Sequence, residues 1–309
     1  MSSSRGSSSG HKLGQLVGDW FEKHVALALL QSVAQELGLY LDHRFQDRSC
    51  RSGKIKWADL DGNEVDYDFV LELGGTDNNQ GVPVAFFETF WRRGSRHSKD
   101  KARDDSGKLL PMRETYPTAR VLGIIAAGDF TKPAQDLIGS RNIDLFWLPK
   151  AMICAAWEAC GVAMDYDDGA AELVKREIVN RVEPLLTDRK QQDIYKRLIS
   201  IVGQPVFTSY TQRIIASVAA VPIEFRLTCV FVSQPIVFLH HQDADIFLRK
   251  QNLSNFPNGS KLFRYEVVFS DGHIFYRANL NPDEAIKLHE AVGSIAENFR
   301  KYHERQTAT

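Results

Sequence analysis

Two neighbouring segments with different strand patterns limit the possible folds of this chain more than any other feature. Residues 64–73 (EVDYDFVLEL) alternate between polar and apolar side chains, and residues 82–91 (VPVAFFETFW) form a short apolar run. Alternation is typical of a half-buried strand, whereas a short apolar run between turn signals is typical of a buried one. The loop between them, GGTDNNQG, is rich in turn-forming residues. We therefore expect two hairpin-paired strands inside a sheet.

Helical and strand patterns follow one another on both sides of this pair. The expected order is helix, strands, helix, strand, helix, strand, helix. The helices are expected at residues 14–37, 95–112, 133–140 and 150–160, and the strands at 40–45, 55–58, 64–73, 82–91, 120–126 and 143–148. Gly38 supplies a natural end to the first helix. This order predicts a mixed α/β layer built on a central sheet.

A short acidic segment, DYDDG at residues 165–169, is the best candidate for a domain boundary. Beyond it we expect helices at 170–202 and 210–218, strands at 224–233 and 235–240, a hairpin at 261–280 and a last helix from Asn281. The start, MSSSRGSSSG, is typical of a disordered tail. The expected division is a tail at 1–11, a first domain at 12–164 and a smaller α+β domain at 170–309.

Composition excludes several classes of protein. Hydrophobic residues make up 43% and charged residues 25% of the chain, which is typical of soluble proteins. The net charge of −1 gives no overall attraction to nucleic acid or membranes, so any basic surface must be local. No run of about 18 apolar residues could span a membrane, and the first residues lack the apolar core of a secretory signal. The four cysteines form no CxxC pair, so we expect free thiols and a cytoplasmic location.

Three carboxylates lie on the two central strand segments. Asp66 and Asp68 are two residues apart on a strand and therefore project from the same face. Glu88 lies in a run of aromatic residues, where an uncompensated negative charge is costly. A divalent cation would compensate these charges, and hard oxygen ligands suit Mg²⁺. The sequence predicts a magnesium site at Asp66, Asp68 and Glu88, with a solvated strand face as the alternative for the two aspartates.

A basic run follows directly after the second strand. Residues 92–103 include one acid, Asp100, and the cations Arg92, Arg93, Arg96, Lys99, Lys101 and Arg103. Cations beside carboxylates suit the hydrolysis of a phosphodiester, because the cations bind phosphate. We expect contacts to DNA from Arg93, Arg96, His97, Lys101 and Arg103. An ordinary solvated helix is the alternative.

The helix segment GDWFEKHV, which contains Glu22, and the segments GNEVDYDFVLE and VAFFETFW resemble the core of the PD-(D/E)XK nucleases. The resemblance covers about residues 14–150, and the helix segment with Glu22 is similar to the first helix of Mrr-like nucleases and Holliday-junction resolvases. It implies a restriction-endonuclease-like fold, in which helices flank a central mixed sheet, and Mg²⁺-dependent hydrolysis of DNA. Asp66 or Asp68 matches the first acid of the family, Glu88 matches the second, and Glu22 matches the helix acid that sometimes joins the metal ligands.

Phe90 departs from this pattern, because the family places a lysine at that position. Either a cation from elsewhere in the chain replaces the lysine, or this copy is inactive. Arg92 lies on the same strand face as Glu88, and Lys99 and Lys101 lie on the next expected helix. We favour Lys99, because helical spacing puts Arg96, Lys99 and Arg103 on one side.

The resemblance implies an endodeoxyribonuclease of restriction-modification or phage defence, acting on double-stranded DNA as a homodimer. The second half carries no catalytic motif, and by default it is a recognition or dimerisation module. The segment HHQDAD at 240–245 matches no established metal-ligand spacing, so we expect a turn into a helix capped by Asp243. Two alternatives stay open: a catalytically inactive nuclease-fold module that binds DNA or assists assembly, and a structural protein without a nucleic-acid role.

Overall fold

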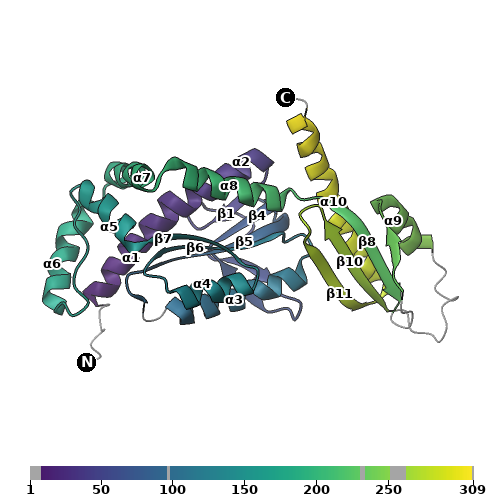
Figure 1. The fold of residues 1–309 in the computed structure, drawn as a ribbon, viewed down its shortest axis with the longest axis horizontal. Coiled ribbons are helices and arrows are strands. Elements are labelled where there is room, and N and C mark those ends of the chain that lie inside the picture. The colour runs from purple at the N-terminus through teal and green to yellow at the C-terminus, as the bar shows by residue number, and fades with distance from the viewer. Residues whose placement is uncertain (1–7, 96–97, 230–233, 251–261, 308–309) are drawn as a thin grey trace.

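A five-stranded mixed sheet forms the centre of the computed structural model, which describes residues 8–95, 98–229, 234–250 and 262–307 (Figure 1). The strand order is β1-β4-β5-β6-β7. The strands are β1 (Tyr40–His43), β4 (Phe69–Leu73), β5 (Val82–Arg92), β6 (Val121–Gly128) and β7 (Asp144–Pro149). β1–β4 and β4–β5 are antiparallel pairs, and β5–β6 and β6–β7 are parallel pairs. The prediction of a mixed sheet with a central hairpin pair is therefore confirmed.

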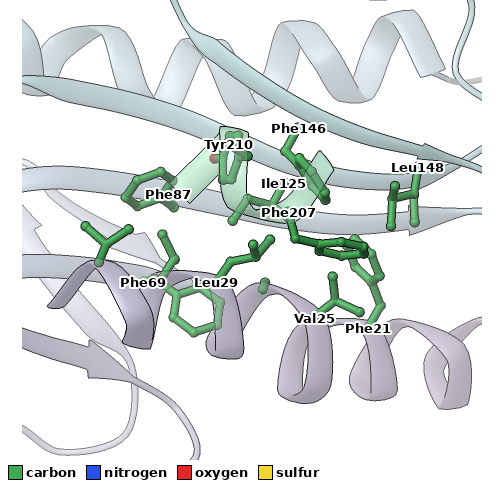
Figure 2. Close-up of a cluster of buried hydrophobic side chains, with 14 of the residues drawn as sticks. Phe21, Val25, Leu29, Phe69, Phe87, Ile125, Phe146, Leu148, Phe207 and Tyr210 are labelled. Carbon is green, nitrogen blue, oxygen red and sulfur yellow. The ribbon is translucent and has the colours of Figure 1, made fainter. Parts of the chain in front are cut away.

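Helices flank both faces of this sheet (Figure 1). On one face lie α1 (Ser9–Phe21), a π-helical turn η1 (Glu22–Ala26), α2 (Leu27–Leu37) and α5 (Lys150–Ala159). On the other face lie α3 (Ser98–Thr115) and α4 (Lys132–Ser140). Because strand side chains alternate, β5 buries Phe87 in the first hydrophobic cluster and Phe86 in the second. Figure 2 shows the first cluster, in which Phe21 and Leu29 pack against the strands.

The predicted strand at 64–73 is divided in two at Asp68. The backbone bends at this residue, so that β3 (Glu64–Tyr67) pairs with β2 (Ile55–Ala58) in a separate two-stranded sheet. β4 stays in the central sheet between β1 and β5. The bend places Asp68 at the point where the chain leaves the central sheet.

Packing moves the domain boundary to a later residue than the sequence predicts. Three further helices, α6 (Glu172–Val182), α7 (Asp188–Val202) and α8 (Gln204–Val218), bury side chains in the same cluster as α1 and α2. The acidic segment at 165–169 is a largely exposed loop between α5 and α6, and both helices bury side chains in this one core. Its Asp165 and Asp168 form ion pairs with Arg93, the residue that follows β5. The expected domain at 170–309 is wrong in this respect, because residues 172–218 complete the first core.

Residues 222–307, here called the C-terminal module, form a four-stranded antiparallel sheet in the order β11-β10-β8-β9. The strands are β8 (Pro222–Cys229), β9 (Ile236–Phe238), β10 (Phe263–Phe269) and β11 (Ile274–Leu280). The helices α9 (His241–Lys250) and α10 (Pro282–Thr307) pack against this sheet, which has its own hydrophobic cluster. The predicted hairpin turns at Gly272, whose φ is +82°, and Asp243 lies inside the first turn of α9. The predicted strand at 224–233 ends outside the described residues.

A buried ion network ties β1 to β4. The guanidinium of Arg48 is only 1% exposed, and it lies 2.8 Å from Asp42 on β1 and 2.6 Å from Glu72 on β4. Its remaining donors reach the carbonyl oxygens of Thr76 and Asn79 in the loop after β4. The network therefore fixes both the strand pair and the loop. None of the helices in the described ranges is long and apolar enough to cross a bilayer.

Candidate functional site

Glu88 lies in the middle of the central strand β5, on the face that is covered by α3. Its neighbours on that face, Phe86 and Phe90, belong to the hydrophobic cluster beneath α3. The side chain is almost completely buried, with the whole residue 2% exposed. Burial and the nearby charge of Asp68 together raise the pKa of Glu88 to about 8, against the opposing effect of Lys108. A carboxyl group in this position needs a specific partner.

Asp68 is held beside Glu88 by the bend in the backbone. Phe69 pairs with Phe87, so the same antiparallel register would place residue 68 across from residue 88. The Oδ2 atom of Asp68 accepts hydrogen bonds from the backbone N–H of Thr89 at 2.7 Å and from its hydroxyl at 2.9 Å. These bonds fix the aspartate on β5. Two carboxylates from adjacent strands therefore lie together on the sheet.

α3 brings three more charged groups to the same place. Lys101, Asp105 and Lys108 are spaced by four and three residues, so they share one face of the helix. The Nζ atom of Lys108 lies 3.2 Å and 3.5 Å from the two carboxylate oxygens of Glu88. Lys101 lies 2.5 Å from one oxygen of Asp105. We call Asp68, Glu88, Lys101, Asp105 and Lys108 the Glu88 cluster.

Asp105 is the least satisfied member of the Glu88 cluster. Its side chain is completely buried, and its Oδ2 atom has no hydrogen-bond partner among the residues that the structure describes. Burial raises the pKa of Asp105, and the charge of Asp68 raises it further, against the effect of Lys101 and Lys108. A buried carboxylate oxygen without a partner is costly, which points to a missing cation or donor at this place.

Glu22 lies at the rim of the Glu88 cluster, in the π-helical turn η1. Such turns are rare and often occur at functional sites. Arg44 donates to both oxygens of Glu22, at 2.7 Å and 2.8 Å, and also reaches Asp19. Burial raises the pKa of Glu22, Arg44 lowers it, and Asp68 raises it. The predicted helix acid therefore lies within electrostatic reach of Asp68, with its carboxylate already bound by Arg44.

Asp66 lies apart from these acids. Its side chain is 43% exposed and forms a 2.8 Å ion pair with Lys54. That hydrogen bond lowers the pKa of Asp66, which keeps the carboxylate charged in solvent. Of the two aspartates that the sequence left open, Asp68 is the one that lies beside Glu88.

Of the predicted cations that the structure describes, Lys101 lies in the Glu88 cluster and the others lie away from it. Arg92 and Lys99 are exposed, and the cation that contacts Glu88 is Lys108. Arg93 is engaged by Asp165 and Asp168 and lies over the ring of Tyr166 at 3.8 Å. Arg103 is exposed and lies 3.6 Å from Asp100. Arg96 and His97 lie outside the described residues.

Lys108 and Asp105 are not among the site residues predicted from the sequence, although a signal for them is present. With Lys101 they repeat at helical spacing and alternate with Ala102, Leu109 and Met112, which α3 buries against the sheet. Charged residues that share a helix side with buried apolar residues face the core boundary.

A divalent cation fits the residues that are present. Within the described part of the chain, no three His, Cys, Asp or Glu side chains form a ready metal-binding group. Mg²⁺ keeps several water ligands, however, and needs only one or two protein carboxylates. Asp68 and Glu88 supply such a pair. A cation there would also compensate the burial of the Glu88 carboxylate and its repulsion with Asp68 and Asp105, which together raise the pKa of Glu88.

The metal-free protein is expected to lose stability as the pH rises from about 5 to about 8, partly through Glu88. The pKa of this group is about 8 in the folded protein and 4.5 as its unperturbed value, so the folded state holds a proton that the unfolded chain has released. Its contribution is complete below pH 4.5 and is lost as the pH rises through 8. In thermal unfolding without metal, the drop in Tm between pH 5 and pH 8 should be smaller for Glu88→Gln than for the wild type. Equal drops would contradict the buried, raised carboxyl.

Comparisons with known proteins add little to this geometry. No protein-family model matches the chain, and no curated protein matches it. The fold is similar to a solved structure titled "Crystal Structure of Protein of Unknown Function AF1548", at 13% sequence identity and a TM-score of 0.27. The match covers 64% of this chain and 98% of that chain. At this TM-score the likeness carries no argument, so the functional conclusion depends on the site.

Proposed function

We propose that the protein is a magnesium-dependent deoxyribonuclease with a PD-(D/E)XK-like catalytic core. The observation that supports this most is the Glu88 cluster, in which a buried glutamate on the central strand lies beside an aspartate and a lysine. The resemblance predicts two acids and a lysine on such a sheet. The mixed sheet with helices on both faces is consistent with the restriction-endonuclease-like fold that we propose.

Asp68 and Glu88 are the residues that would hold the cation. When bound, Mg²⁺ would polarise the phosphodiester and stabilise the leaving oxygen. Asp68 is oriented for this by the two hydrogen bonds from Thr89. The burial of Glu88 excludes bulk water from one side of the pair, which strengthens the interaction with a cation.

We assign to Lys108 the role of the family's catalytic lysine, because Phe90 occupies that lysine's usual position and carries no charge. It comes from α3 and reaches the same glutamate, at 3.2 Å. Burial lowers the pKa of Lys108, but Glu88, Asp66 and Asp105 together raise it above its usual value, so the amine stays charged at neutral pH. A charged amine beside the acid pair can orient a water molecule and stabilise negative charge on a phosphate. Phe90 packs against Phe130 in the core, with ring centroids 5.4 Å apart.

Replacing Lys108 with methionine is expected to lower the rate of DNA cleavage by roughly a hundredfold or more, the usual contribution of a positioned charge or proton donor. Plasmid cleavage with Mg²⁺, and with EDTA as the metal-free reference, measures this effect. Lys99→Met is the matched control, because Lys99 is exposed on the same helix. The assignment fails if both variants cut DNA as fast as the wild type.

Phe90 favours a second candidate function, a nuclease-fold module that binds DNA without cutting it. Phe90 is 8% exposed and lies within the core, so it contributes no charge to the site. The same plasmid assay separates the two candidates. Binding without any cleavage in Mg²⁺ or Mn²⁺ would favour the inactive module.

The substrate, oligomeric state and biological role that we propose rest on the resemblance to the PD-(D/E)XK nucleases. We propose double-stranded DNA as the substrate, a homodimer in which each copy cuts one strand, and restriction or phage defence in the cytoplasm as the role. A two-fold pair of active sites suits the two strands of a duplex.

A further inference from the structure

α3 carries three members of the Glu88 cluster but is a weak helix by sequence. It contains Gly107 and Pro111 between Lys101 and its C-terminal end at Thr115. Proline has no N–H to complete the helical hydrogen-bond pattern, and glycine adds backbone freedom. The position of α3 must therefore depend on contacts from outside the helix.

The C-terminal module makes such a contact at the end of α3. Arg277 on β11 donates hydrogen bonds to the carbonyl oxygens of Glu114 and Thr115, with the bond to Thr115 at 2.6 Å. The last carbonyl groups of a helix have no partner inside the helix, and the negative end of the helix dipole attracts a cation. Arg277 therefore satisfies two groups that α3 cannot satisfy itself.

The surroundings of Arg277 show that this contact is its main partner. Arg277 forms no ion pair with a carboxylate among the residues described, and its Nε atom is buried without a hydrogen-bond partner. Burial lowers the pKa of Arg277, and the nearby acids Glu284 and Glu114 oppose this effect. A half-buried guanidinium without an ion-pair partner needs other strong acceptors. Those acceptors are the carbonyl oxygens of α3.

A second contact fixes the segment that connects α3 to β6. The guanidinium of Arg120 is 1% exposed and donates to both carboxylate oxygens of Asp271, each at 2.9 Å. It also lies 3.5 Å from the centre of the ring of Phe269. Asp271 and Phe269 belong to the β10–β11 hairpin of the C-terminal module. The module therefore holds the chain on both sides of the turn after α3.

We infer that the C-terminal module is a positioning part of the candidate active site, because Arg277 clamps α3 and so holds Lys101, Asp105 and Lys108 against Glu88. Lys108 is seven residues from Thr115, a distance of about 10 Å along a helix. The catalytic meaning of the clamp rests on the proposed nuclease function. The clamp itself is a structural relation that can be measured without DNA.

Hydrogen exchange on the full-length, metal-free protein tests the clamp. Arg277→Met is expected to speed amide exchange in residues 101–110 roughly tenfold, the order of effect of losing a hydrogen bond to a charged group. Arg277→Lys should restore most of the protection, because it keeps a cation at the helix end. Arg249→Met is the control, because Arg249 pairs with Asp245 and Glu290 inside the same module.

Catalysis supplies a second readout. In Arg277→Met, kcat for DNA cleavage should fall about tenfold with little change in KM, the pattern of a residue that acts on the chemical step alone. Asp271→Asn replaces Arg277→Met as the test if the latter does not fold, and it should speed exchange in the same residues.

Unchanged exchange in α3, or equal acceleration in Arg249→Met, would overturn the clamp. A wild-type protein that cuts no DNA would remove the nuclease proposal, while the exchange data would still decide the clamp.

Discussion

Glu88→Gln is expected to reduce the rate of Mg²⁺-dependent DNA cleavage by roughly a thousandfold or more. The reason is that a bound cation contributes several kcal/mol of charge stabilisation, and each loss of about 1.4 kcal/mol lowers the rate tenfold. Glutamine keeps the size of the side chain and an acceptor for Lys108, but it cannot carry the negative charge that binds a cation. Initial rates of plasmid cleavage at saturating Mg²⁺ measure the effect. Retention of more than a tenth of the wild-type rate would contradict the assigned role.

Glu64→Gln is the matched control for this variant. Glu64 is an exposed acid on β3 that pairs with Lys56 at 2.8 Å, and it lies outside the Glu88 cluster. We expect its activity to stay within a few-fold of the wild type, because exposed ion pairs contribute little. The melting temperature of Glu88→Gln shows whether lost cleavage comes from the site or from unfolding, since removing a buried acid should not destabilise the protein at pH 8.

Arg48→Met is expected to destabilise the protein by about 3–5 kcal/mol, the usual result of removing one partner from a buried ion network. The change leaves Glu72 buried without its cation and leaves Asp42 with Arg51 alone, and it frees the loop that Arg48 holds through Thr76 and Asn79. Urea unfolding of the metal-free protein, followed by circular dichroism, measures the free energy of unfolding.

Arg103→Met is the control for Arg48, because Arg103 is an exposed arginine that lies 3.6 Å from Asp100. Its replacement should change stability by less than about 0.5 kcal/mol. A second variant tests the cause: replacing Arg48 and Glu72 together with apolar residues should recover part of the loss, because Asp42 keeps its ion pair with Arg51 and no unpaired charge stays buried. A loss below about 1 kcal/mol for Arg48→Met would show that the network is not a main source of stability.

The central strand pair was predictable because its signals are local. The apolar run at 82–91 and the turn-rich loop before it define β5 and its hairpin pairing directly. The same signals place Glu88 in a buried strand. The bend at Asp68 was hard to predict, because polar and apolar residues still alternate from Glu64 to Phe69, and only the apolar run 69–71 that follows marks the strand buried on both faces. Only the pairing of β3 with β2 shows where the strand leaves the sheet.

The cations of the site were harder to predict, because a count of charges does not show where side chains point. Arg93 and Lys101 lie close in sequence, yet Arg93 turns to Asp165 and Asp168 and Lys101 turns to Asp105. The position of Lys108 depends on how α3 packs against β5, which is a tertiary relation. The domain boundary was missed for a similar reason, since the amphipathic helices at 172–218 would look the same whichever core they joined.

Titration of the metal-free protein with Mg²⁺ in a calorimeter, without DNA, tests the central claim most directly. The wild type and Glu64→Gln should both show saturable binding at one class of site, and Asp68→Asn and Glu88→Gln should each lose most of that affinity. If all four proteins bind Mg²⁺ alike, or if none binds it, then Asp68 at the bend before β4 and Glu88 on β5 do not form a metal site.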